Sequence, residues 1–299
     1  MSWTDLSKLT WEAGYRLAME DEGLELSGYI AFTTFIALFP FLIFLAALAG
    51  FLGDEDAAAG FIRAMFEFMP DDVAETLAPA IREVIETRRG GLLTVGIVST
   101  LWVSSSGVEA LRTGLNRAYG VREERPIWWL RLQSLAFVVV GALIILFLSL
   151  VVILGPIVWR VLGPGIEHVF EYWLFWTAIR YVAAAVLLWG ALMLLHRWLP
   201  NTKQAYRRVL PGVCVTVVLW LLAASLFSWY LGNVADYTLI YGSLGGVTIT
   251  LVFFYLTAMI FIFGAELNAA WRRRVGLPRP KQEVRADSDP PARPTPPSP

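Results

Sequence analysis

Long apolar blocks separated by short polar stretches dominate the chain. A membrane-spanning helix needs about 20 mostly apolar residues, and six windows approach or exceed this length. They lie near residues 28–52, 91–108, 135–158, 173–195, 209–231 and 243–267. The second window is rich in Ser and Thr, including Ser104–Ser106, whose hydroxyls can bond to carbonyls of the preceding helical turn. The pattern therefore predicts an all-α, polytopic membrane protein with six transmembrane helices.

Three further segments carry apolar residues on one helical face only. Residues 3–18 place Leu6, Leu9, Ala13 and Leu17 together, which predicts an amphipathic N-terminal helix. Residues 55–69 and 72–87 show the same periodicity and are expected on the non-cytoplasmic side. From residue 277 onward the chain is Pro-rich and almost free of aliphatic residues, which is typical of disorder. We therefore expect one helical membrane domain over 1–276 and a disordered cytoplasmic tail over 277–299.

The distribution of basic residues predicts the orientation. Of the 24 Lys and Arg residues, 18 lie in 1–27, 109–134, 196–208 and 268–299, which alternate with the segments that hold few. Lys and Arg are concentrated in the cytoplasmic loops of membrane proteins. The sequence thus predicts an even number of spans with cytoplasmic N- and C-termini. The arginines would form a basic cytoplasmic rim that attracts anionic lipid headgroups.

The composition limits the classes of function that fit. Apolar residues make up 57% of the chain and charged residues 16%, against roughly half and a quarter in soluble domains, which argues against a soluble enzyme. The net charge of −1 provides no basic field for nucleic acid. The single Cys and two distant His residues suggest neither a metal site nor a cofactor. No catalytic residues are predicted.

Two charged residues lie within the apolar windows, where charge is costly unless it has a partner or a task. Arg180, in the fourth window, could extend to the interface, contact an anion or headgroup, or form an ion pair. Glu266, near the end of the sixth window, could anchor neighbouring helices by hydrogen bonds or couple to protons or cations. Asn268 lies two residues further on and joins them as a candidate for substrate or ion binding.

Two other groups of residues are candidates on weaker grounds. Tyr241 and Ser243 begin a stretch of small residues before the last window, which permits close helix packing or a broken helix start facing a ligand. Below the second window, four polar residues recur at helical spacing and predict i, i+3 pairing along a cytoplasmic helix, or contact with headgroups. These four are Glu109, Arg112, Asn116 and Arg117.

Several short motifs, taken in order, resemble the YihY/BrkB family. The first span, GYIAFTTFIALFPFLIFLAALAGFLG, is similar to the opening span of that family, and the segment Leu101–Val121 resembles its second block. The later matches are Leu199–Asn201, Leu210–Gly212, Tyr241–Ser243 and Gly264–Ala269. The resemblance covers roughly residues 10–272. It implies a six-span bacterial membrane protein but no established catalytic residues, since members have carried ribonuclease BN, virulence-factor and transport labels.

These observations lead to several functional hypotheses. The first is a transporter or lipid-handling protein of the bacterial envelope, with membrane lipids as partners. The alternatives are a non-transporting membrane scaffold and a cation or proton antiporter. A ribonuclease would need a metal site or an acid–base pair facing the cytoplasm, which the residues do not support, so we expect no enzymatic activity. The transported substrate and the oligomeric state, a homo-oligomer included, are left open.

Overall fold

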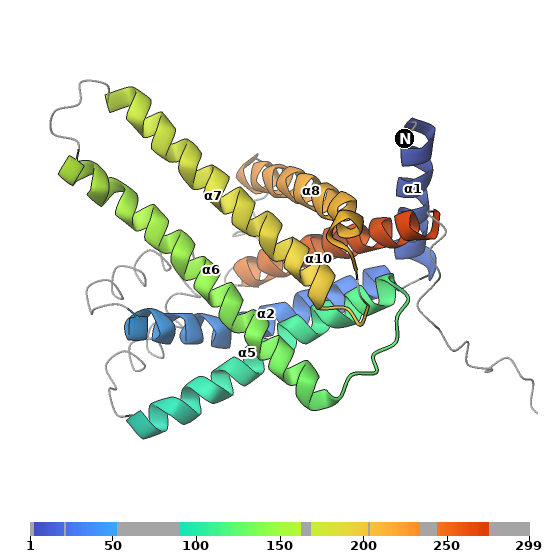
Figure 1. The fold of residues 1–299 in the computed structure, drawn as a ribbon, viewed down its shortest axis with the longest axis horizontal. Coiled ribbons are helices and arrows are strands. Elements are labelled where there is room, and N and C mark those ends of the chain that lie inside the picture. Colours follow the sequence, from blue (N-terminus) through green and yellow to red (C-terminus); the bar gives the residue numbers. More distant parts are fainter. Residues whose placement is uncertain are drawn as a thin grey trace, which may run out of the picture.

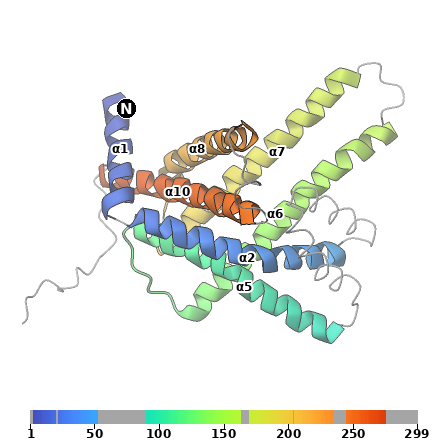
Figure 2. The ribbon, with the colours of Figure 1, turned by 180° about the vertical axis from the view of Figure 1, so that it is seen from behind.

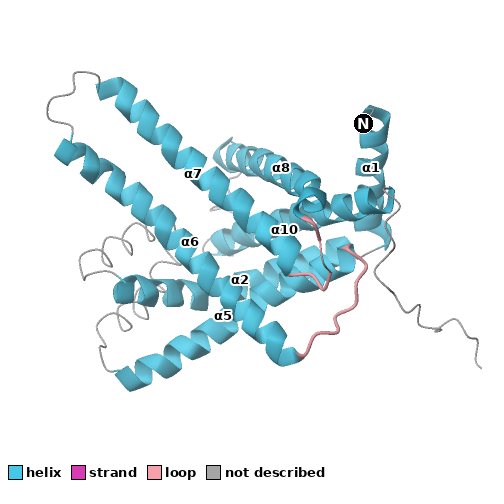
Figure 3. Cartoon of the chain, viewed as in Figure 1, coloured by secondary structure: helices cyan, strands magenta, loops and turns pink. Residues whose placement is uncertain are grey.

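The described part of the chain is helical apart from turns and short connections (Figure 3). The computed structural model describes residues 3–20, 22–52, 90–162, 169–202, 204–233 and 244–274. These ranges contain seven α-helices and one π-helical segment, and no strand. They are α1 (Trp3–Tyr15), η1 (Arg16–Glu20), α2 (Gly23–Leu52), α5 (Gly90–Ala118), α6 (Ile127–Leu162), α7 (Val169–Trp198), α8 (Tyr206–Asn233) and α10 (Leu244–Arg274). The predicted all-α class is confirmed.

The predicted windows correspond to six long helices, but these helices do not all qualify equally as membrane spans. Four are long and apolar enough to cross a membrane, namely α2, α6, α8 and α10. Within α7 the described apolar segment is the shorter Val182–Trp198. The second window lies in α5, which is more polar because it carries several hydroxyl residues and, nearer its C-terminus, Glu109 and Arg112. A multi-pass membrane protein is therefore supported, whereas the number of six spans stays a prediction.

The hydroxyl groups of α5 bond as the sequence predicts. Ser104 donates to the carbonyl of Thr100 at 2.7 Å, and Ser105 donates to that of Trp102 at 2.7 Å. Each hydroxyl is thus satisfied inside its own helix. This bonding lowers the cost of placing these polar groups in apolar surroundings.

The six long helices alternate in direction and meet at one end. Figures 1 and 2 show α6 and α7 diverging from the other four helices away from this end. We call it the basic end. It is formed by the C-terminal ends of α5, α7 and α10 and the N-terminal ends of α2, α6 and α8. The helix ends at this side of the molecule and the α5–α6 connection carry most of the arginines of the described chain.

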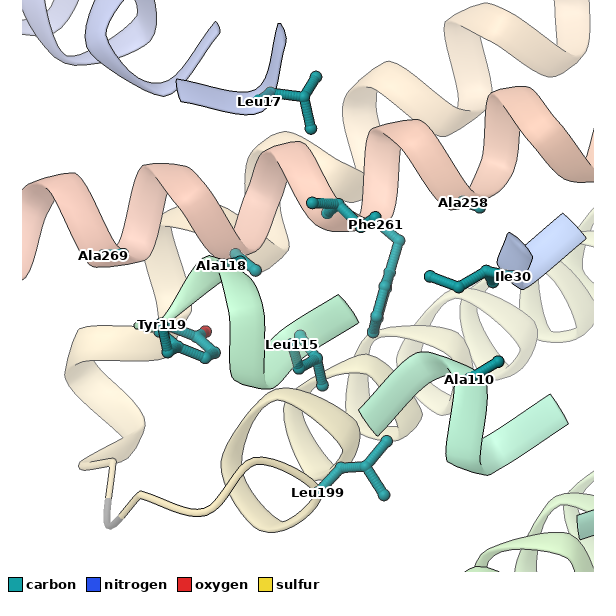
Figure 4. Packing of buried hydrophobic residues seen from close by; sticks show 12 residues of the cluster. Leu17, Ile30, Ala110, Leu115, Ala118, Tyr119, Leu199, Ala258, Phe261 and Ala269 are labelled. Carbon is teal, nitrogen blue, oxygen red and sulfur yellow. The ribbon is translucent and has the colours of Figure 1, made fainter. Parts of the chain in front are cut away.

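The main core lies close to the basic end (Figure 4). Small residues on α5 and α10, including Ala110, Ala118, Ala265 and Ala269, let the helix backbones approach closely. Larger apolar side chains, such as Phe261 of α10, fill the remaining space. A second cluster lies further along α2 and α6 and includes Leu45 and Ala142. The helices are thus held together most extensively where the polar residues also gather.

The amphipathic N-terminal segment packs against the last helix. Leu9 and Ala13 of α1 are buried against Leu267 and Ala270 of α10, and Leu17 of η1 joins the main core. The predicted apolar face is therefore confirmed for these three residues. The predicted single helix over 3–18 differs in one respect, because the wider π-helical turn follows α1. The predicted helices at 55–69 and 72–87 and the tail over 277–299 lie outside the described residues.

Candidate functional site

The C-terminus of α5 places a tyrosine inside the basic end. Gly120 has a positive φ of 62°, which ends the helix. The amide of Val121 donates to Asn116 O, and that of Gly120 donates to Arg117 O, both at 2.9 Å. This pair of bonds closes the helix as a Schellman motif. It leaves Tyr119 directed into the core, where its side chain is labelled in Figure 4.

A close approach of α8 and α10 lies beside this tyrosine. A Cβ on Gly212 would lie 2.1 Å from the carbonyl oxygen of Gly264, so only a glycine fits there without movement of the helices. Pro211, one residue earlier, lacks an amide hydrogen and disturbs the hydrogen bonds of the first turns of α8. The amide of Gly212 donates to Asn268 Oδ1 of α10 at 2.7 Å. Asn268 is buried and ties the two helices together.

The backbone donor at Gly212 determines the direction of a longer chain of hydrogen bonds. Since Asn268 Oδ1 accepts from Gly212, its Nδ2 is left to donate to Tyr119 Oη, at 3.3 Å. The tyrosine hydroxyl can then donate to His196 Nδ1 of α7, at 3.2 Å. Burial raises the pKa of Tyr119, which keeps the hydroxyl protonated for this task. In neutral His196 the ring proton consequently lies on Nε2.

The predicted candidate Glu266 is fully buried and forms an ion pair with the N-terminal segment. Arg16 Nε of η1 donates to Glu266 Oε2 at 3.2 Å. Arg16 also reaches Glu20, one turn away, at 3.0 Å. A second contact between the same elements pairs Arg273 with Glu12 at 3.0 Å. A buried carboxylate needs such a partner, and the geometry agrees with the interpretation of Glu266 as an anchor between helices.

The two connections at the basic end are joined by a set of polar side chains. Asn116 Oδ1 accepts from the amide of Asn201, and Asn116 Nδ2 donates to Glu123. Arg125 binds both oxygens of Glu123, with Nε and Nη2 at 2.8 and 2.7 Å, and also donates to Leu199 O. Burial alone would raise the pKa of Glu123, but the hydrogen bonds from Arg125 and Asn116 lower it below its usual value. The carboxylate thus connects α5–α6 to α7–α8.

The other predicted residues of α5 bind the neighbouring helices. Arg112 donates to Leu130 O at 2.9 Å and to Ser134 Oγ at 2.5 Å, both on α6. Glu109 forms an ion pair with Arg131 of α6 at 2.7 Å. Arg117 reaches Glu22, just before α2, at 3.3 Å. These contacts run between elements, and they add to the electrostatic attraction between Glu109 and Arg112, which are three residues apart on α5.

The structure brings some of the predicted candidates together and leaves others undescribed. Glu266 and Asn268 lie on α10 at the basic end, and Asn116 lies at the end of α5 nearby. Tyr241 and Ser243 lie outside the described residues. Arg180 belongs to α7, but its side chain lies outside the described residues.

Sequence reasoning missed three residues that form buried or half-buried polar contacts with distant partners. Tyr119, His196 and Arg16 are separated from their partners by 149, 77 and 250 residues. No local spacing connects residues so far apart. The one available signal was the position of polar residues at the ends of several apolar blocks, which the alternating helices bring to the same end. Among the described residues, no group of three His, Cys, Asp or Glu side chains could hold a metal ion.

The helical fold and its long apolar segments define a multi-pass membrane protein. Within that class, the chain belongs to the virulence factor BrkB family, whose model matches residues 15–289. The resemblance drawn from the sequence motifs is thereby confirmed.

Comparison with individual proteins agrees with this assignment. The chain is 31% identical to the ribonuclease-like protein YfkH of Bacillus subtilis (strain 168), over 86% of this chain and 93% of the relative. It is 28% identical to a UPF0761 membrane protein of Chromobacterium violaceum, over 84% of this chain but 61% of the longer relative. A UPF0761 membrane protein of Pseudoalteromonas translucida is 23% identical, over 87% and 84%. No solved structure matches the chain significantly.

Proposed function

We propose that this protein handles lipid in the bacterial cytoplasmic membrane by helping lipid molecules move within or across the bilayer. One observation carries the proposal: α6, α7 and α8 expose apolar side chains along their length, whereas buried polar groups and arginines gather at the basic end. Exposed apolar residues include Val140, Leu143 and Phe147 on α6, Val182 and Val186 on α7, and Leu222 and Leu226 on α8. This division of polarity along the helices matches that of a lipid, whose acyl chains are apolar and whose headgroup is polar.

An ion or proton antiporter is less well supported by the same geometry. Such a protein needs titratable groups along a route through the membrane. Glu266, the predicted candidate for coupling, pairs with Arg16 and lies at the basic end rather than midway along the helices. Lipid handling requires no such route, because acyl chains can stay in the bilayer while the headgroup passes.

We further propose that the basic end faces the cytoplasm, that both termini lie on that side, and that the protein is not an enzyme. The positive-inside rule supports the orientation, since the arginines of the α5–α6 connection and of the adjoining ends of α7, α8 and α10 lie at this end. Anionic lipids of the inner leaflet would then be the first membrane partners of the basic end. The ribonuclease-like name of the Bacillus subtilis relative stays with that protein.

Reconstitution tests the proposal directly. The purified protein is placed in liposomes with a fluorescent lipid in both leaflets, and a membrane-impermeant reductant then quenches the outer leaflet. We expect the quenched fraction to rise above that of protein-free liposomes. A parallel set of liposomes loaded with a pH-sensitive dye measures proton movement. Proton movement without lipid movement would favour the antiporter.

Two results would refute lipid handling. One is the absence of lipid movement in liposomes that contain correctly folded protein. The other is tight co-purification with an envelope enzyme that survives Glu266→Gln but is lost when the α5–α6 connection is deleted, which would favour the scaffold. Glu20→Gln is the control for Glu266→Gln, because it removes an exposed carboxylate that contacts the same Arg16.

A further inference from the structure

An open pocket of about 590 Å³ lies at the basic end. It is formed around the connection between α7 and α8. Its lining residues are Arg125, Arg197, Trp198, Pro200, Asn201, Thr202 and Gln204. The set contains two arginines, three neutral polar residues and no acidic residue. We propose that this pocket binds a phosphate group, which Arg197 holds by charge-assisted hydrogen bonds.

The two arginines of the pocket differ in their pairing. Arg125 is neutralised by the two-point contact with Glu123, and its other bonds go to Gln133 and Leu199 O. Arg197 donates one hydrogen bond to Gln204 O, and its Cζ atom lies over the ring of Tyr206, 3.9 Å from the centroid. In the described part of the chain, no carboxylate pairs with Arg197. Its charge is therefore the one that an anion in the pocket would meet.

Neighbouring arginines add to the positive potential of the pocket. Arg272 of α10 reaches Thr202 Oγ1 at 3.5 Å, at the edge of the pocket. Arg208 of α8 is near enough to Arg272 to repel it electrostatically. Two guanidinium groups, those of Arg197 on α7 and Arg272 on α10, thus reach the α7–α8 connection, and that of Arg208 lies near the second. Such a cluster is stabilised by an anion, and phosphate accepts planar, paired hydrogen bonds from guanidinium well.

A buried amide provides the second indication of a ligand. The side chain of Gln204 is buried, and its Nε2 makes no hydrogen bond within the described residues. An amide donor left without an acceptor is unfavourable in a folded protein. A phosphate oxygen in the pocket that Gln204 lines would supply that acceptor after a small movement of the amide.

The flanking aromatic residues suggest where the phosphate comes from. Trp198 is 57% exposed and Tyr206 is 53% exposed, one at each side of the connection. Exposed Trp and Tyr at helix ends are typical of the headgroup level of a membrane. The phosphate of an anionic phospholipid lies at this level, although a soluble phosphate ester offers the same chemistry. The choice of lipid rests on the proposed function, whereas binding of phosphate to the pocket does not.

Binding measurements test the inference without relying on transport. The full chain is placed in nanodiscs of phosphatidylcholine and titrated with short-chain phosphatidylglycerol, short-chain phosphatidylcholine or inorganic phosphate, and binding is followed by native mass spectrometry. We expect phosphatidylglycerol to bind the wild type, and Arg197→Gln to weaken binding by about tenfold or more, as the loss of a charged hydrogen bond implies. Arg117→Gln removes the same charge from the basic end outside the pocket and should change the affinity by less than about twofold.

The outcomes separate the sources of phosphate and the two proposals. Binding of phosphatidylglycerol that Arg197→Gln weakens indicates a lipid headgroup, and binding of inorganic phosphate alone that Arg197→Gln weakens indicates a soluble ligand. Equal weakening by Arg197→Gln and Arg117→Gln would show general attraction to the basic end and would overturn the site. Binding of neither phosphatidylglycerol nor inorganic phosphate to the wild type would do the same. Lipid movement in liposomes with no effect of Arg197→Gln on binding would refute the pocket while the proposed function stands.

Discussion

The contact between α8 and α10 predicts a large cost for adding one methyl group. In Gly212→Ala, the new Cβ would lie 2.1 Å from Gly264 O and 2.4 Å from Asn268 Nδ2. Ordinary contacts of a Cβ begin at 3.4 Å, so the helices must separate by about 1 Å, which loses dispersion contacts along the interface. The movement also strains the 2.7 Å bond from Gly212 to Asn268, on which the direction of the Tyr119–His196 hydrogen bond depends.

The size of the effect follows from these two losses. Overpacking costs about 1–3 kcal/mol, and a lost hydrogen bond adds about 0.5–1.5 kcal/mol. We expect the free energy of unfolding of Gly212→Ala to fall by about 2–4 kcal/mol. The melting temperature in detergent should drop by roughly 5–10 °C. Size-exclusion chromatography after heating, read by intrinsic fluorescence, measures it.

Two other helical glycines, which have open space around the position of a Cβ atom, provide matched controls. A Cβ on Gly141 of α6 or Gly190 of α7 finds no atom within 4 Å. Alanine favours a helix over glycine by about 1 kcal/mol, so Gly141→Ala and Gly190→Ala should leave the melting temperature unchanged or raise it slightly. If Gly212→Ala has the same melting temperature as these controls, the close approach of α8 and α10 does not contribute to stability and the prediction is refuted.

Gly264 of α10, on the other side of the same contact, allows a second test. A Cβ on Gly264 would lie 1.9 Å from Thr216 Oγ1 and 2.9 Å from Gly212 O. Gly264→Ala should therefore also destabilise the protein. Adding Thr216→Ala removes the hydroxyl that the new methyl group would meet, so the double variant should recover part of the loss. Strict additivity of the two substitutions would contradict direct contact between them.

Three other results follow from the polar contacts. Arg16→Ala removes the guanidinium that pairs with the buried Glu266 at 3.2 Å. This variant should lower the melting temperature more than Glu266→Gln does, since the amide of the glutamine can still accept a hydrogen bond from Arg16. Similar melting temperatures of the two variants would contradict the ion pair. Glu123→Gln should destabilise the protein at pH 7, because a lowered pKa stabilises the fold above the unfolded-state value of about 4.3, and this advantage is lost as the pH falls through the lower folded-state pKa. Thermal melts from pH 7 to 3 should show the melting temperatures of the wild type and Glu123→Gln converging. A constant difference between them would contradict the lowered pKa of Glu123. In a chain whose single cysteine has been removed by Cys214→Ser, the added substitution Glu20→Cys should allow labelling by an impermeant maleimide only in inside-out vesicles. Labelling in intact spheroplasts would reverse the proposed orientation.

Much of the fold could be predicted from the sequence because the signals are local. An apolar block long enough to span a bilayer indicates a helix wherever it occurs, and each window falls within one long helix, from α2 (Gly23–Leu52) to α10 (Leu244–Arg274). The helices extend beyond the windows at the basic end, because amphipathic turns such as those carrying Arg112 and Asn116 continue the helix after the apolar pattern stops. The apolar pattern thus predicts which segments cross the membrane better than it predicts where each helix begins and ends.

The candidate residues could be predicted only in part, for a different reason. Glu266 and Asn268 stand out because polar groups are rare within apolar blocks. Their roles depend on partners that the sequence does not indicate, since Arg16 is 250 residues from Glu266 and Tyr119 is 149 residues from Asn268. Arg197 looked like one more basic residue of a loop. Its importance emerges from the absence of an acidic residue among the described residues that line its pocket.

The sequence by itself determined the class of this protein, a helical membrane protein of the BrkB family, and the gathering of its basic residues in alternate connections. Transfer of apolar side chains out of water depends on composition over about 20 residues, which any single chain displays. The tertiary structure decided which polar groups meet at the basic end, and it left Arg197 without a carboxylate partner among the described residues. Hydrogen bonds and ion pairs act over a few ångströms, so their partners are defined only when helices distant in sequence have packed together.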